Sequence, residues 1–88
     1  MKEITLDSGF VCQIDEAALD DQELLDDLIG LDQNPARYSS VLVRLFGEEQ
    51  KKALYEHLRN KETGRVPATL VAKTVGEVFS KLNGKAKN

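Results

Sequence analysis

The segment YSSVLVRLFGEEQKKALYEHLRN, residues 38–60, limits what this chain can fold into more than any other part of it. At about 100° per residue, the apolar residues of its first half span an arc of roughly 140°, which Val43 widens to roughly 200°. A single core-facing stripe needs less. We therefore expect a helix that either lies at the centre of the fold or offers part of its apolar face to a partner. The five residues of the narrower arc are Tyr38, Val41, Leu42, Leu45 and Phe46.

The length of 88 residues allows one domain, which we place at residues 1–84. A hydrophobic content of 41% and an aromatic content of 6% are typical of a small soluble globule. No apolar run approaches the roughly 20 residues that span a bilayer, and the charged start Met1-Lys2-Glu3 lacks the apolar region of a signal peptide. The single cysteine, Cys12, excludes an internal disulfide and fits a reducing compartment. We expect a cytoplasmic protein without a membrane partner.

Charge is divided unevenly along the sequence. Residues 1–35 carry ten acidic residues and one basic residue, a net charge of −9, whereas residues 36–88 carry eleven basic and five acidic residues, a net charge of +6. Opposite poles can pair within one fold or align protomers head to tail. We expect pairing and solvation within one molecule, with a homo-oligomer as the open alternative.

The N-terminal pattern predicts a β-hairpin at residues 3–14. Two short β-rich runs flank Asp7-Ser8-Gly9, and three loop residues ending in glycine match a type I turn closed by a left-handed glycine. Phe10, Cys12 and Ile14 alternate onto one face, and Val11 and Gln13 onto the other. An isolated hairpin is marginal in water, so it must lie on helices or extend a partner's sheet.

Four helices are expected after the hairpin. The first begins at Asp20, as the cap of a capping box with Glu23, and Leu19 and Leu24 form a hydrophobic staple. Its inner face is Leu24, Leu25, Leu28, Ile29 and Leu31, whereas Asp26 and Asp27 face solvent.

The second helix begins at Asn34-Pro35, with asparagine as the cap and proline at the first helical position, and Gly47 ends it or bends it into the next. The third runs from Glu48 to Asn60 and buries a narrow stripe; the fourth begins at Pro67. The stripe is Ala53, Leu54, His57 and Leu58, and the inner face of the fourth helix is Leu70, Val71, Val75, Val78, Phe79 and Leu82. Asn83-Gly84 stops this helix before a frayed tail at residues 85–88. The predicted fold is mainly α, a short hairpin followed by four helices in a small bundle.

The residue types argue against an enzyme. One cysteine and one histidine cannot build a Cys/His metal site, and the aspartate pairs at 20–21 and 26–27 lack the EF-hand spacing. We interpret Cys12 as a buried small hydrophobic residue and His57, which has no partner for acid–base work, as structural. The sequence also lacks a nucleophile elbow and a glycine-rich phosphate loop. No catalytic, cofactor or metal residue is predicted.

Two stretches resemble one protein family. LFGEEQKKALYEHLRNKETGRVP is similar to a segment of the tail assembly chaperones of long, non-contractile-tailed phages and prophages of Gram-positive bacteria. That segment has a leucine-rich helix, Gly-Glu-Glu-Gln, a helix ending in His-Leu-Arg, a charged loop and Gly-Arg-Val. The N-terminal stretch TLDSGFVCQIDEAALDDQELLDDL is also similar, so the resemblance covers residues 4–79.

The resemblance implies a non-enzymatic function. Such chaperones bind the tape measure protein, a long and largely helical ruler, and keep it soluble while tube subunits polymerise around it. They act in the host cytoplasm and are not retained in the virion. A frameshifted, longer form often contacts the tail tube protein. The family supplies no catalytic residues.

A chaperone of this kind covers apolar helical surface on its client with apolar surface of its own. We predict that its partner-binding residues are Tyr38, Leu42, Val43, Leu45, Phe46, Leu54 and Tyr55.

Two other functions remain open. In a structural tail adaptor or completion subunit, the hairpin would pair edge to edge in a ring. In a nucleic-acid-binding regulator, LVAKTVGEVFSKL at residues 70–82 would form a helix-turn-helix, because Ala72 and Gly76 stand four apart. Glu77 falls where that motif needs an apolar residue, and the chain as a whole is acidic, so we expect a continuous helix and no nucleic-acid partner.

Overall fold

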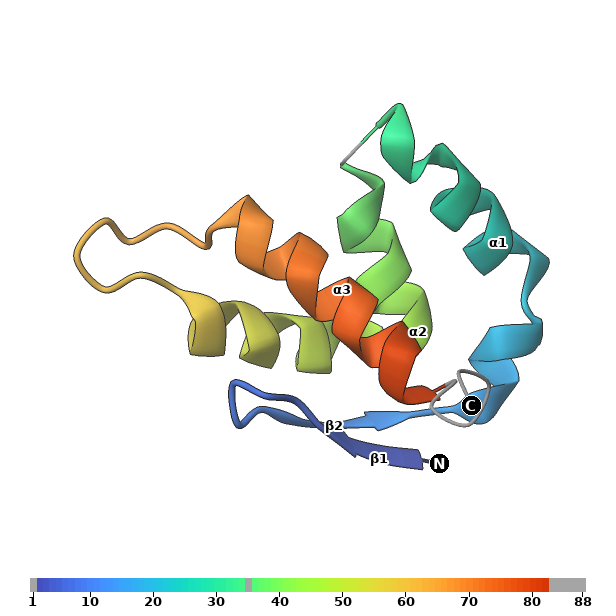
Figure 1. Cartoon of the computed structure of the whole chain (residues 1–88), viewed down its shortest axis with the longest axis horizontal. Helices are drawn as coiled ribbons and strands as arrows, with labels where there is room; N and C mark the ends of the chain where they lie inside the picture. The colour runs from blue at the N-terminus through green and yellow to red at the C-terminus, as the bar shows by residue number, and fades with distance from the viewer. Residues whose placement is uncertain (1, 35, 83–88) are drawn as a thin grey trace.

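The computed structural model describes residues 2–34 and 36–82. Figure 1 shows a short N-terminal hairpin and a mainly helical remainder, which confirms the predicted fold class in this form. The elements are β1 (Lys2–Thr5), β2 (Val11–Ile14), the 3-10 helix η1 (Glu16–Asp20), α1 (Gln22–Ile29), the 3-10 helix η2 (Gly30–Asp32), α2 (Arg37–Leu58) and α3 (Ala68–Leu82).

The helix count differs from the prediction, because the described residues form three α-helices rather than four. Helix α2 spans both the second and the third expected helix, and only Gly47 departs from helical geometry, with φ 87° and ψ 167°. This backbone region is accessible to glycine and strained for other residues. The chain therefore turns at one residue and needs no linker. We call residues 37–46 the N-terminal arm of α2 and residues 48–58 its C-terminal arm (Figure 1).

The hairpin forms as predicted. Strands β1 and β2 are antiparallel, with Ile4 paired to Cys12. Gly9 adopts φ 95° at the turn, as expected for the glycine that closes it. Its N–H donates to the carbonyl of Leu6 at 2.8 Å. Cys12 and Ile14 are buried, while Val11 and Gln13 are exposed, so the predicted alternation of faces is confirmed.

A side chain of α2 occupies the outer edge of β2. The N–H of Gln13 donates to Oε1 of Gln50 at 2.7 Å, and Nε2 of Gln50 donates to the carbonyl of Gln13, also at 2.7 Å. The Gln50 amide thus reproduces the two hydrogen bonds that a neighbouring strand would make. It ties the hairpin to the helices and leaves the middle of this edge unavailable to another strand.

Helix α1 begins one residue later than predicted. Its N-cap is Asp21, whose Oδ1 accepts from the N–H groups of Glu23 at 2.8 Å and Leu24 at 3.4 Å, while Asp20 ends η1. The expected cap at Asp20 is therefore wrong. The staple is wrong as well, because Leu19 no longer stands directly before the cap and its side chain is exposed. The acidic run offered two possible caps, and the preceding 3-10 helix decides between them.

Asn34 stabilises the turn before α2, but it is not the N-cap of that helix as predicted. Its Oδ1 accepts from the N–H of Ala36 at 3.2 Å, and its carbonyl accepts from the N–H of Arg37 at 2.9 Å. The expected first helical residue, Pro35, lies outside the described residues. Helix α3 begins at Ala68, directly after the predicted Pro67, whose carbonyl accepts from Leu70 and Val71. The predicted stop at residues 83–84 and the tail at 85–88 also lie outside the described residues.

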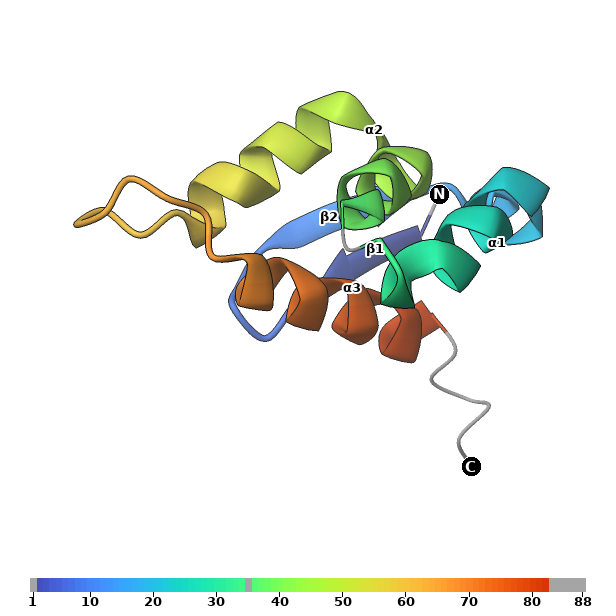
Figure 2. The same cartoon turned by 90° about the horizontal axis from the view of Figure 1, so that it is seen from above.

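The N-terminal arm of α2 lies at the centre of the core. It packs against α1, and α2 also contacts α3 and β2. Figures 1 and 2 show α1 and α3 beside this arm, with the hairpin along one side of α2 and α3. The wide apolar arc thus serves as a central core helix. The buried apolar residues are Ile4, Leu6, Cys12, Ile14, Leu24, Val41, Leu42, Leu45, Phe46, Leu54, Val71, Val75 and Val78.

Candidate functional site

A buried carboxylate joins α1 to α2. Asp27 was expected to face solvent, but it is only 8% exposed, so that expectation is wrong. Its Oδ1 accepts from Nη1 of Arg37 at 3.0 Å, and its Oδ2 accepts from Oγ of Ser40 at 2.6 Å and from Nε of Arg44 at 3.0 Å. Arg44 also reaches Glu23 at 3.0 Å. The expected pairing of the acidic first part of the chain with the basic remainder therefore occurs within one molecule.

The partners of Asp27 give it a structural rather than a catalytic role. The hydrogen bond from Ser40, reinforced by Arg44 and Arg37, lowers the pKa of this carboxyl group, although partial burial acts in the opposite direction. A carboxylate held ionised in this way has no proton to donate near neutral pH. Asp27 therefore fixes α1 on α2 and is not a candidate general acid.

The two other residues considered for chemistry are also structural. Cys12 is fully buried, and burial, followed by the charge of Glu77, raises the pKa of its thiol and disfavours the reactive thiolate. Nε2 of His57 lies 3.0 Å from the carbonyl oxygen of Ser8, and its ring centroid is 5.5 Å from that of Phe10. His57 therefore holds the hairpin turn against the C-terminal arm of α2.

The described residues include neither a metal-binding cluster nor a membrane-spanning helix. Within residues 2–34 and 36–82, no three His, Cys, Asp or Glu side chains come together in a way that could hold a metal ion. No helix in this part of the chain combines the length and apolar character needed to cross a bilayer.

The predicted partner-binding residues separate into two groups. Leu42, Leu45, Phe46 and Leu54 are at most 9% exposed, so in this fold they belong to the core and provide no surface for a partner. The sequence pattern could not distinguish these residues from a binding patch, because the apolar arc faces both α1 and α3. Val43, Tyr38 and Tyr55 are only partly buried.

Tyr38 and Tyr55 line a groove of about 420 Å³ between the two arms of α2 and the start of α3. We call it the α2–α3 groove. Its other lining residues are Ala36, Ser39, Val66, Ala68, Thr69, Val71 and Ala72, and none of the nine carries a charge. Ala68 and Ala72 stand one helical turn apart, so their short side chains lie on the same face of α3 and add little bulk to the groove wall. This pair was not predicted as part of a site, although two alanines at this spacing near a helix start are visible in the sequence.

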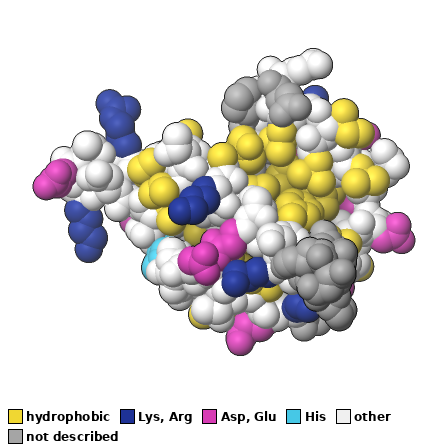
Figure 3. Space-filling view, viewed as in Figure 1, with side chains coloured by type: hydrophobic (Ala, Val, Ile, Leu, Met, Phe, Trp, Pro, Cys, Tyr) yellow, Lys and Arg dark blue, Asp and Glu magenta, His cyan; other side chains and the backbone are white. Residues whose placement is uncertain are grey.

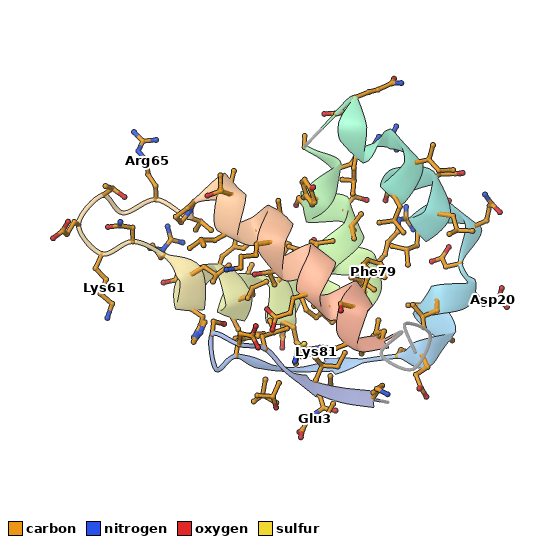
Figure 4. The ribbon with its side chains drawn as sticks, in the orientation of Figure 1. Glu3, Asp20, Lys61, Arg65, Phe79 and Lys81 are labelled. Carbon is orange, nitrogen blue, oxygen red and sulfur yellow. The ribbon has the colours of Figure 1, made fainter. Side chains whose placement is uncertain are left out.

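One cationic side chain, Lys51, contacts two lining residues of the α2–α3 groove. Nζ of Lys51 donates to Oγ of Ser39 at 3.0 Å and lies 5.7 Å from the ring centroid of Tyr55. Glu48 also pairs with Lys51, at 3.6 Å. Arg65 directly precedes Val66 and is exposed. Figure 4 shows Arg65 extending outward from the loop that leads into α3.

A second apolar surface lies on α1. Leu25 and Ile29 were expected to face the core, but they are 45% and 76% exposed, so that expectation is wrong. The ion pairs of Asp27 with Arg37 and Arg44 hold the Asp27 face of α1 against α2. Leu25 and Ile29 lie on the opposite face and remain exposed. Figure 3 shows hydrophobic side chains gathered over the region between α1 and α3, where the view in Figure 4 also places Phe79.

A scan against protein-family models finds no match, and searches of curated proteins and of solved structures likewise find none.

Proposed function

We propose that this protein is a non-catalytic phage tail assembly chaperone that binds an apolar helical stripe of the tape measure protein in the α2–α3 groove. The observation that carries the proposal is the groove itself, which is uncharged and lined by two tyrosines and small residues. A partly apolar concavity of this kind accepts an amphipathic helix. The sequence resemblance of residues 4–79 supplies the identity of the client.

The size of the groove supports reversible rather than permanent binding. Burial of one large apolar side chain contributes about 1.5–3 kcal/mol, and a groove of about 420 Å³ accommodates only a few such side chains. Association itself costs about 4–15 kcal/mol. The remaining free energy therefore corresponds to a contact that forms and dissociates, as required of a chaperone that must leave before the tube closes around its client.

The first test is the gene neighbourhood, where the proposal expects a reading frame for a very long, largely helical protein after this gene. Co-expression with that protein should keep it soluble and allow the two to be purified together. Thr69→Glu places a charge in the groove at an exposed position of α3. The variant should lose the client, because an unpaired charge opposite an apolar stripe is costly to bury. An acidic residue in the first helical turn also suits the helix dipole, so the fold should persist.

A matched control is Thr5→Glu, the same change at an exposed position of β1 that does not line the groove. This variant should retain the client. Equal loss of client in both variants, or equal retention in both, would contradict the assignment of the groove.

The structural-adaptor alternative is less well supported, because Gln50 occupies the middle of the β2 edge. Detection of the protein in purified tail particles would nevertheless favour it over a chaperone. The regulator alternative has no supporting observation: α3 is a single helix over Ala68–Leu82, as expected, and does not contain the turn of a helix-turn-helix.

A further inference from the structure

The outer face of α1 is an apolar pair with an acidic neighbour. Leu25 and Ile29 stand four residues apart, so their side chains lie one above the other, and Asp26 borders them. Both apolar side chains are among the most exposed large hydrophobic residues of the described chain. Asp27, on the opposite side of the helix, holds α1 in this orientation through its bonds to Arg37 and Arg44. The exposure is therefore fixed by the fold and is not a consequence of a loosely packed helix.

The charges of this face and of the α2–α3 groove are complementary. Helix α1 contains three acidic residues and no basic residue. Glu23 and Asp27 are engaged by arginines of α2, whereas within residues 2–34 and 36–82 the side chain of Asp26 is bonded only by Nε2 of Gln22, at 3.1 Å, in the same helix. The described lining residues of the groove include no carboxylate, and Lys51, which donates to the lining residue Ser39, has the exposed Glu48 at 3.6 Å as its acidic partner. An acidic helix with an apolar pair matches such a groove in both respects.

We propose that α1 of one molecule docks in the α2–α3 groove of a second copy of this chain, with Leu25 and Ile29 inserted and Asp26 directed towards Lys51. The two contacting surfaces are different, so each molecule uses its α1 towards one neighbour and its groove towards the same or another neighbour. Such a heterologous contact closes into a reciprocal pair or a ring, or continues as a chain. The inference goes beyond the proposed function and does not depend on the identity of the client.

Self-docking would also protect the apolar surfaces before a client arrives. An open apolar groove and an exposed apolar pair are both aggregation liabilities on a small protein. If one covers the other, both are shielded in the free protein. A client helix would then compete with α1 for the groove.

The test begins with sedimentation velocity of the wild-type chain over a concentration series up to about 1 mM, the range of weak association. The wild type should associate as its concentration rises. Ile29→Asp and Thr69→Glu should each weaken association by at least about tenfold, because each places a charge in the apolar contact. Ile29 is 76% exposed, so its replacement should leave the fold intact, which circular dichroism and urea unfolding would verify.

Mixing the two variants makes the test specific. Ile29→Asp retains a working groove, and Thr69→Glu retains a working α1, so their mixture should form a one-to-one complex that neither forms alone. Leu19→Asp alters an exposed apolar residue of η1 rather than of α1, and should associate like the wild type.

Three results would overturn the inference: a wild-type chain that stays monomeric up to about 1 mM, undiminished association of Ile29→Asp, or a mixture that remains monomeric. A groove that binds the tape measure protein in a chain that never self-associates would make the client its sole occupant. That result would overturn this inference while leaving the proposed function in place.

Discussion

The N-terminal arm of α2 and helix α1 pack against each other but distribute their apolar residues in opposite ways. In the α2 arm, Leu42 and Leu45 are at most 1% exposed. In α1, Ile29 is 76% exposed, while the carboxylate of Asp27 is buried. The arm buries the face that its hydrophobic pattern predicts, whereas α1 exposes part of its predicted apolar face.

The difference has a physical cause in the contacts between the two helices. The apolar residues of the α2 arm repeat over more than two turns, so that only one orientation of the helix buries most of them. Helix α1 has only eight residues, and of its four large apolar side chains Leu24 is buried while Leu25 and Ile29 are exposed. Two arginines and a serine on α2 then select the flank that carries Asp27. In a short helix, a few charge-assisted hydrogen bonds can rotate the helix away from the orientation that its hydrophobic pattern favours.

Truncation of Leu42 should have the largest effect. Leu42→Ala removes a fully buried side chain and should lower the free energy of unfolding by about 2–5 kcal/mol, measured by urea denaturation. The total stability of a domain is about 5–15 kcal/mol, so this loss threatens the fold. The matched control, Leu25→Ala on the outer face of α1, should change stability by no more than about 0.5 kcal/mol. Similar losses from the two substitutions would contradict the contrast between the helices.

Replacement of Gly47 should have the next largest effect, because this residue sets the end of the apolar arm. Gly47→Ala forces a side chain into φ 87° and ψ 167°, and should cost about 1–3 kcal/mol of stability in urea denaturation. The control, Gly76→Ala, lies at an exposed position of α3 where a Cβ would meet no atom within 4 Å. It should raise stability by about 0.5–1 kcal/mol. If both substitutions raised the free energy of unfolding, α2 would run straight through residue 47.

The sequence was sufficient to predict elements that follow local rules. The glycine of the hairpin turn and the alternation around Cys12 were predicted correctly, whereas the wide apolar helix was left as either a core helix or a binding surface. The partition of that apolar arc between core and surface was not predictable, because a periodic pattern specifies a face and not the elements that cover it. The same limit applies to α1, where Arg37 and Arg44 lie in another helix and determine which side of α1 is buried.

The candidate groove was the least predictable feature. Tyr38 and Tyr55 were identified in the sequence, but they belong to different arms of α2, and only the bend at Gly47 brings them to one groove. The remaining wall comes from Val66 and the two alanines at the start of α3. Small residues contribute to a groove by leaving space, and the sequence gives no sign of which small residue lies opposite a gap.

The smallest effect at neutral pH is expected from Asp27→Asn, which tests the polar side of the comparison. Asparagine keeps the shape, and its Oδ1 can still accept the hydrogen bonds from Ser40 and Arg44, although its Nδ2 then faces Arg37 as a second donor. The side chains of Arg37 and Arg44 are 41% and 33% exposed, so water can solvate them when the charge of residue 27 is lost. We therefore expect a smaller loss of stability than for Leu42→Ala, measured by the same urea denaturation.

For Asp27→Asn, the pH dependence of the loss in unfolding free energy is more informative than the magnitude of that loss. The pKa of Asp27 in the folded protein lies below the ordinary aspartate value of about 4, chiefly because of the hydrogen bond from Ser40 and then the arginines. A lowered pKa means that Asp27 contributes its stability above the unfolded-state pKa and loses it as the pH falls through the lower, folded-state pKa. The unfolding free energies of the wild type and Asp27→Asn should therefore differ most near neutral pH and converge in acid.

Glu56, whose pKa is lowered by its hydrogen bond to Arg59, titrates in both proteins, so both should retain some acid lability. A difference in unfolding free energy that stays constant from pH 7 to about pH 2 would show that ionised Asp27 does not hold α1 in its orientation.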